Sequence, residues 1–132
     1  MSASWELQKA IYTTLEAALV QPVYSLGNVP QAFEGVYVVV GDSTLLPHDS
    51  DQQLGFECTI KVDTWDNDPN SRGFNQLKPL MGEVYNALNR ATFTVTGYTL
   101  VDIQSEFEQP FLDPDGVTTH GVQRFRAILT TQ

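Results

Sequence analysis

The sequence has few cysteines, histidines and basic residues. A single cysteine, Cys58, excludes any disulfide within the chain and with it the cross-linked scaffold of many small secreted domains. Two histidines, His48 and His120, are a thin supply for acid–base catalysis. Seven Lys and Arg against 16 Asp and Glu, a formal net charge of −9, cannot build the large basic patch of a nucleic-acid-binding protein. We therefore expect repulsion from nucleic acid.

Long apolar runs are also missing, so no membrane association is expected. The first 20 residues place Glu6, Lys9 and Glu16 among their apolar positions, which excludes both a signal-peptide core and a membrane span. A chain of 132 residues with 42% apolar and 17% charged residues suits one folded domain that covers residues 1–132.

Two stretches carry apolar residues at the spacing of amphipathic helices, three and four positions apart. They run from Ser4 to Val20, before Pro22, and from Phe74 to Asn89. Pro79 lies inside the second stretch, where its ring removes a backbone hydrogen bond and clashes with the preceding turn. This helix is therefore expected either to bend or to begin late.

The extended segments predict an antiparallel sheet. A β-branched run from Val36 to Gly41 predicts a buried strand, and residues 56–65 alternate so that Cys58 and Ile60 face inward. Residues 98–130 form two extended arms around the turn-forming pair Asp115-Gly116, which predicts a long C-terminal hairpin. The order of elements predicts an α+β fold with two helices packed on one face of a mainly antiparallel sheet.

Three polar segments are expected to be long exposed loops: Asp42 to Gly55, Asp66 to Gly73, and Gln109 to Val117. Loops of this length in a small domain usually make contacts or are mobile. The first contains His48, Asp49 and Asp51, whose close spacing is unlike that of known metal sites, so a solvated loop is favoured. "DNDPNS" lacks the glycine and the terminal acid of a calcium loop. We expect no cofactor and no metal.

Two candidates for chemistry remain. Cys58 falls on the inward face of its strand, where cysteines mostly behave as small hydrophobic residues. Arg124 and Arg126 share one strand face near His120. The residues alone favour pairing of these arginines with acids on the neighbouring arm of the hairpin, such as Asp102, Glu106 or Glu108.

Several segments together resemble, in order and spacing, the tail-terminator or tail-completion proteins of long-tailed bacteriophages and gene transfer agents. They are "VYVVVGDSTLLPHDSDQQLGFECTIKVDTW", "LMGEVYNAL" and "LDPDGVTTHGVQRFRAIL". The most specific features are the Gly-Asp pair after the first strand, the strand that ends at Trp65, and the His-Gly-Val-Gln-Arg-Phe-Arg strand. The resemblance covers nearly the whole chain.

The resemblance implies a structural protein of the virion tail without catalysis, present in the host cytoplasm during assembly. Such a protein forms a hexameric ring at the head-proximal end of the tail tube, stops tube growth and joins the tail to the head connector. Its implied partners are further copies of itself, the tube protein and the connector protein, while duplex DNA passes through without specific binding. The competing hypotheses are a small monomeric adaptor or binding domain and a small-molecule enzyme. In such a ring Arg124 and Arg126 pair either with acids of their own chain or with acids of a neighbouring subunit, and the sequence leaves both alternatives open. Candidate contact residues are His48, Asp49, Asp51, Asp66, Asp68, Asp113, Asp115, His120, Arg124 and Arg126.

Overall fold

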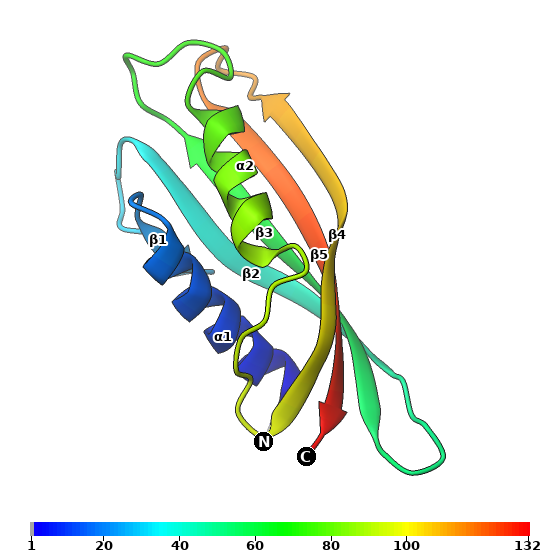
Figure 1. Cartoon of the computed structure of the whole chain (residues 1–132). Helices are drawn as coiled ribbons and strands as arrows, with labels where there is room; N and C mark the ends of the chain where they lie inside the picture. Colours follow the sequence, from blue (N-terminus) through cyan, green and yellow to red (C-terminus); the bar gives the residue numbers. More distant parts are fainter. Residues whose placement is uncertain (1) are drawn as a thin grey trace.

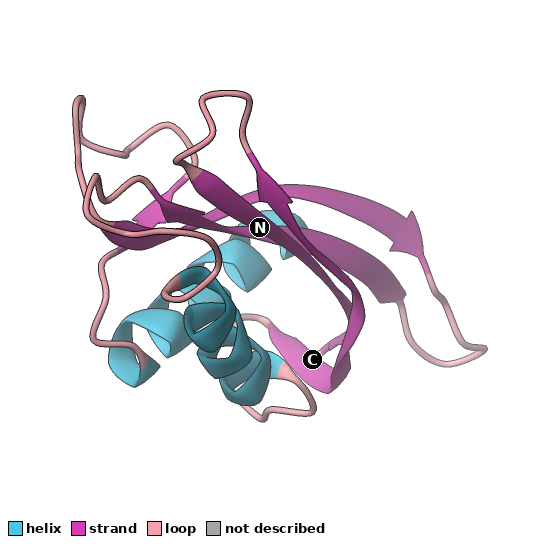
Figure 2. Cartoon of the chain, turned by 90° about the horizontal axis from the view of Figure 1, so that it is seen from above, coloured by secondary structure: helices cyan, strands magenta, loops and turns pink. Residues whose placement is uncertain are grey.

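A computed structural model describes residues 2–132 as two helices packed against a five-stranded sheet. The helices are α1 (Ala3–Ala18) and α2 (Leu77–Leu88), and the strands are β1 (Val23–Ser25), β2 (Val36–Pro47), β3 (Gly55–Asp66), β4 (Tyr98–Leu112) and β5 (Thr119–Thr131). The strand order is β1-β2-β3-β5-β4, with β1 parallel to β2 and every other pair antiparallel. Both helices cover the same face of the sheet (Figures 1 and 2), which confirms the predicted α+β class.

Helix α1 begins where a serine caps it and ends before a proline. The Ser2 hydroxyl accepts a hydrogen bond from the backbone N–H of Trp5 at 3.2 Å, which satisfies one of the free donors of the first turn. Leu7, Ile11 and Leu15 lie on the buried side of the helix. The chain leaves the helix at Leu19 in an extended conformation, so the helix is slightly shorter than the sequence predicts.

Helix α2 begins late, which is one of the two outcomes expected from its proline. Its first residue is Leu77, so Pro79 lies in the first turn. Backbone N–H groups in a first turn have no acceptor within the helix, and the missing donor of proline therefore costs little there. Leu80, Met81 and Val84 turn toward the sheet and are buried.

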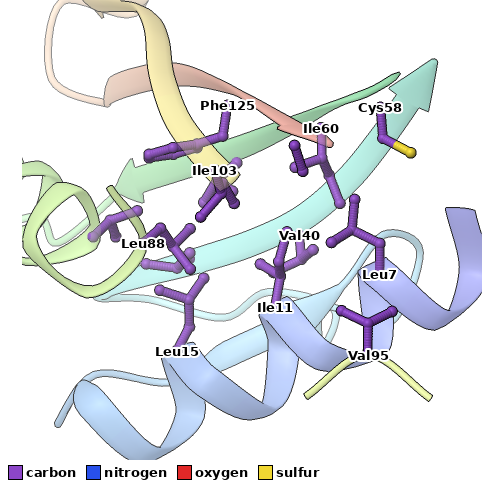
Figure 3. Close-up of a cluster of buried hydrophobic side chains, with 14 of the residues drawn as sticks. Leu7, Ile11, Leu15, Val40, Cys58, Ile60, Leu88, Val95, Ile103 and Phe125 are labelled. Atoms are coloured by element: carbon purple, nitrogen blue, oxygen red, sulfur yellow. The ribbon is translucent and has the colours of Figure 1, made fainter. Parts of the chain in front are cut away.

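The core lies between the two helices and the three middle strands. Strand β3 contributes Cys58, Ile60 and Val62, and the facing residues of β5 are Phe125 and Ala127. All five are fully buried, and Figure 3 shows side chains of both helices meeting this layer. The predicted alternation of β3 and β5 is therefore confirmed.

Two of the three predicted loops are wrong in part, because strands extend into them. Strand β2 continues to Pro47 and pairs with β3 as far as Phe56, with an irregularity in register between Val40 and Ser43. Strand β4 likewise runs to Leu112. The short β1 was not predicted at all, because its three residues carry too little pattern. Residues 42–54, all exposed, project beyond the helices at one end of the sheet (Figure 1), and we call them the arm.

Candidate interaction surface

The face of the sheet that no helix covers carries a connected polar network around His120. Its ring stacks on Trp65, directly opposite on β3, with ring centroids 3.7 Å apart and an interplanar angle of 7°. Its Nε2 lies 2.8 Å from Oδ1 of Asp63, a carboxylate that is 7% exposed. The other oxygen of Asp63 lies 3.7 Å from Nζ of Lys61, which also approaches Asp42 at 3.7 Å. The histidine is thus held by one stacking contact and one hydrogen bond from β3.

The two arginines of β5 make a second network on the same face. Arg124 Nε donates to Glu106 at 3.0 Å, and Arg126 Nη1 donates to Glu57 at 2.9 Å. The hydrogen bond and charge of Glu57 raise the pKa of Arg126 above its usual value. Of the two alternatives left open, the structure shows the pairing with Glu106 of the same chain, whereas Glu57 on β3 was not among the expected partners. These side chains are between 28% and 50% exposed, and ion pairs at the surface stabilise a fold by about 1 kcal/mol or less.

The six candidate aspartates divide between the two ends of the sheet. Asp49 and Asp51 lie at the tip of the arm, beside His48. The other four lie at the far end of β3 and in the β4–β5 turn: Asp66, Asp68, Asp113 and Asp115. The 12 residues of β3 between the two groups span roughly 40 Å at the usual rise of a strand. One loop surface therefore cannot contain all six.

Several of these aspartates stabilise their own turns. Asp66 was expected on an exposed loop, but it is 1% exposed and accepts hydrogen bonds from Ser71 Oγ at 2.6 Å and Asp68 N–H at 3.1 Å. Asp115 accepts from the side chain and N–H of Thr118 and from the N–H of Val117, and these bonds lower its pKa. The expectation that Asp66 lies on an exposed loop is therefore wrong, since its carboxylate is enclosed, and its contact with another molecule stays a prediction.

The exposed apolar side chains were not singled out by sequence reasoning. On the arm, Leu45, Leu46 and Leu54 are 41%, 57% and 59% exposed. At the opposite edge, the groove between α2 and β4 has a volume of about 630 Å³ and is lined by Gly82, Tyr85, Asn86 and residues 105–108. In the sequence, the feature that indicates this groove is Gly82, a glycine inside an amphipathic helical pattern.

The remaining groups give no support for catalysis. Cys58 is fully buried, and burial followed by the charge of Glu57 raises the pKa of its thiol to about 11, so it stays protonated near neutral pH. Within residues 2–132, His, Cys, Asp and Glu nowhere gather in a group of three that is able to hold a metal ion. No helix in that range is both long and apolar enough to cross a membrane.

The fold and these surfaces define a class of protein: a small α+β domain with an open sheet, whose polar groups serve turns and ion pairs and which exposes apolar side chains on the arm. The family model described as Tail completion protein gp17 matches residues 7–130, and the chain belongs to this family. It is 28% identical over 129 residues to the Tail completion protein gp17 of Bacillus phage SPP1, covering 94% of this chain and 92% of that protein. The resemblance noted in the sequence is confirmed, and the protein is a structural component of tail assembly.

Solved structures share the fold. A chain in the virion of a native gene transfer agent particle matches with a TM-score of 0.83 and 20% identity, over 98% of each chain. A second solved chain matches with a TM-score of 0.59 and 14% identity, over 98% of this chain and 93% of its own length. The same sheet and helix arrangement therefore occurs in a virion component of different sequence.

Proposed function

We propose that this protein forms a hexameric ring at the head-proximal end of the tail tube, ends tube polymerisation there and joins the tail to the head connector. The observation that carries the proposal is the match of residues 7–130 to the tail completion family. The match covers α1 from its fifth residue, all of α2, and the five strands except the last residue of β5, so the proposal concerns the whole fold and not one motif.

The exposed surfaces support a ring. A closed ring of identical subunits needs a heterologous interface, in which two different patches of the same subunit meet. The chain offers two such patches, the leucines of the arm and the groove between α2 and β4, on different edges of the sheet. A twofold dimer would need one self-complementary patch instead.

The charge of the protein supports passage of DNA without binding. Both ends of the sheet carry aspartates, and the formal net charge of the chain is −9. Phosphates that approach either end meet like charge, and no basic stripe is available to release their counterions. We infer that the duplex crosses the ring without specific contacts, and that the aspartates facing the channel keep it free to move.

The test is to remove the protein from an assembling particle and to restore it. Tails purified from cells that lack the protein should have tubes of uncontrolled length and should fail to join heads in vitro. Addition of the purified protein should restore joining and add sixfold density at one end of the tube in averaged electron micrographs. Density of another symmetry, or normal length and joining without the protein, would contradict the proposal.

A further inference from the structure

Helix α2 contains a glycine that no contact or backbone conformation within the described chain requires. Gly82 lies in the middle of the helix and is exposed, and a Cβ atom built on it meets no atom within 4 Å. Its backbone is not in the left-handed region, so any residue would fit. Glycine is one of the poorest helix formers, and it is useful mainly where another backbone must approach closely. That second backbone is not supplied by the described residues of this chain.

The glycine lines a groove next to an unpaired strand edge. The groove runs between α2 and residues 105–108 of β4, the last strand of the sheet. Near the end of α2, Asn89 Oδ1 accepts from the N–H of Ser105 and the N–H of Arg90 donates to the carbonyl of Ile103, so the outer edge of β4 is covered there. Beyond Ser105, no described strand pairs with that edge.

The arm has the complementary properties. Strand β1 pairs with β2 only at residues 38–40, so the outer edge of β2 from Ser43 to Pro47 is unpaired as well. The leucines at 45, 46 and 54 are exposed, although they lie in or beside an ordered strand pair. Exposed apolar residues on a projecting arm are typical of a contact with another protein.

Charge indicates which molecule occupies the groove. Lys78 lies one turn before Gly82 on the same helix face, and it makes no ion pair within residues 2–132. Of the acids nearby, Glu106 is paired with Arg124, and Glu108 accepts a hydrogen bond from the neutral amide of Gln123 and so keeps its charge. Glu83 is rotated about 100° around the helix axis from Gly82.

The tip of the arm carries Asp49 and Asp51, acids that suit Lys78. A second copy of this chain therefore supplies apolar side chains, an open strand edge and complementary charge from one segment.

We propose that the groove beside Gly82 receives the arm of a neighbouring copy, with the arm leucines against Gly82 and Tyr85 and the acidic tip beside Lys78. The inference rests on the proposed ring and names the two surfaces that meet between its subunits. Repeated around the ring, each subunit gives its arm to one neighbour and receives the arm of the other.

Cross-linking tests the contact directly, because the one native cysteine is fully buried and reacts slowly. Tails assembled with the double variant Leu46→Cys, Gly82→Cys and treated with a short bismaleimide should give a ladder of covalent oligomers up to the hexamer. Each single variant should give no ladder. The matched control combines Leu46→Cys with Ala17→Cys, an exposed position on α1 outside the groove, and should give none either.

A substitution that fills the groove provides the second test, measured as incorporation into tails. Gly82→Leu should leave the thermal midpoint of the purified protein unchanged or higher, and should lower its incorporation into tails by about tenfold or more, as for central interface residues. Ala17→Leu, which adds the same side chain to the other exposed helix, should leave incorporation unchanged.

Four results overturn the inference. A sixfold ring without cross-links between positions 46 and 82, or cross-links to the tube or connector protein instead, excludes the arm contact and leaves the proposed function standing. Incorporation of Gly82→Leu into tails at the level of the wild-type protein also excludes the arm contact. The absence of any ring on wild-type tails overturns both proposals.

Discussion

Gly121 tests how closely α2 is packed on the sheet. It lies on β5 beneath α2, where an added Cβ would come within 2.8 Å of Cε and 3.0 Å of Cγ of Met81, and still closer to its sulfur. Met81 is 1% exposed, and its carbonyl accepts a hydrogen bond from the buried Gln123 at 2.9 Å. The thioether, which is buried, must therefore shift to admit a new methyl group. Gly121→Ala should lower the free energy of unfolding by about 1–3 kcal/mol, the usual cost of overpacking a core.

A double-mutant cycle separates this contact from other effects of the substitution. Met81→Ala alone should cost about 2–5 kcal/mol, because it leaves a cavity. In the double variant the new methyl group of residue 121 occupies part of that cavity, so the combined cost should be smaller than the sum by about 1 kcal/mol or more. Urea unfolding followed by circular dichroism measures all four proteins.

The matched control makes the same chemical change where there is space. Gly82→Ala adds a methyl group to an exposed helix position with no neighbour within 4 Å, so it should raise the free energy of unfolding by about 0.5–1 kcal/mol. Equal effects at positions 82 and 121, or additive costs within about 0.5 kcal/mol in the cycle, would refute the close packing of α2 on β5.

Three further outcomes are expected. Ile60→Ala, at the centre of the core, should cost about 2–5 kcal/mol in urea unfolding, and an unmeasurable change would place the side chain at the surface. The pKa of the Cys58 thiol is about 11 in the folded protein against an ordinary 9.0, so the thiol ionises first in the unfolded chain. The free energy of unfolding should therefore fall as the pH rises from 9 to 11. Cys58→Ala, measured by the same urea unfolding, should show a weaker dependence on pH. Wild-type protein should not bind duplex DNA in a filter assay, even at low salt. Rings that carry Asp51→Lys or Asp113→Lys should bind DNA in a salt-sensitive way if the substituted end faces the channel. Tight DNA binding by the unaltered protein would contradict the proposed channel.

Much of the fold was predictable because one-sided burial leaves a periodic pattern. The helices and the inward set of β3 face a core on one side and solvent on the other, and Cys58 and Ile60 follow that pattern. Residues 43–47 of β2 are exposed on both sides, so hydrophobic alternation carries no information about them. The sequence therefore predicts a loop where the structure has a strand.

The contacts of the candidate residues were less predictable, because they depend on strands that are distant in sequence. A hairpin places β4 beside β5, and Glu106 beside Arg124 follows from it. The adjacency of β3 and β5 brings Glu57 to Arg126 and Trp65 to His120, and no local pattern identifies that pairing. The exposed leucines and Gly82 give only a weak signal in the sequence, because exposed apolar residues are common and one glycine is tolerated within a helical pattern.

The ion pairs are distributed unevenly over the surface of the protein. On the helix-free face, Lys61, Arg124 and Arg126 are all paired with acids of their own chain, so this face offers little attraction to another copy. Among residues 2–132, the basic side chains without an ion pair are Arg72, Lys78 and Arg90, which all belong to α2 and its two flanking segments. Unpaired acids gather at both ends of the sheet, and Glu83 and Glu108 are unpaired on the α2 side as well. The proposed contact between copies joins the basic side chains of the α2 side of one copy to an acidic end of the next. Association of this kind is head to tail, and a head-to-tail contact closes into a ring only when its rotation fits a whole number of subunits.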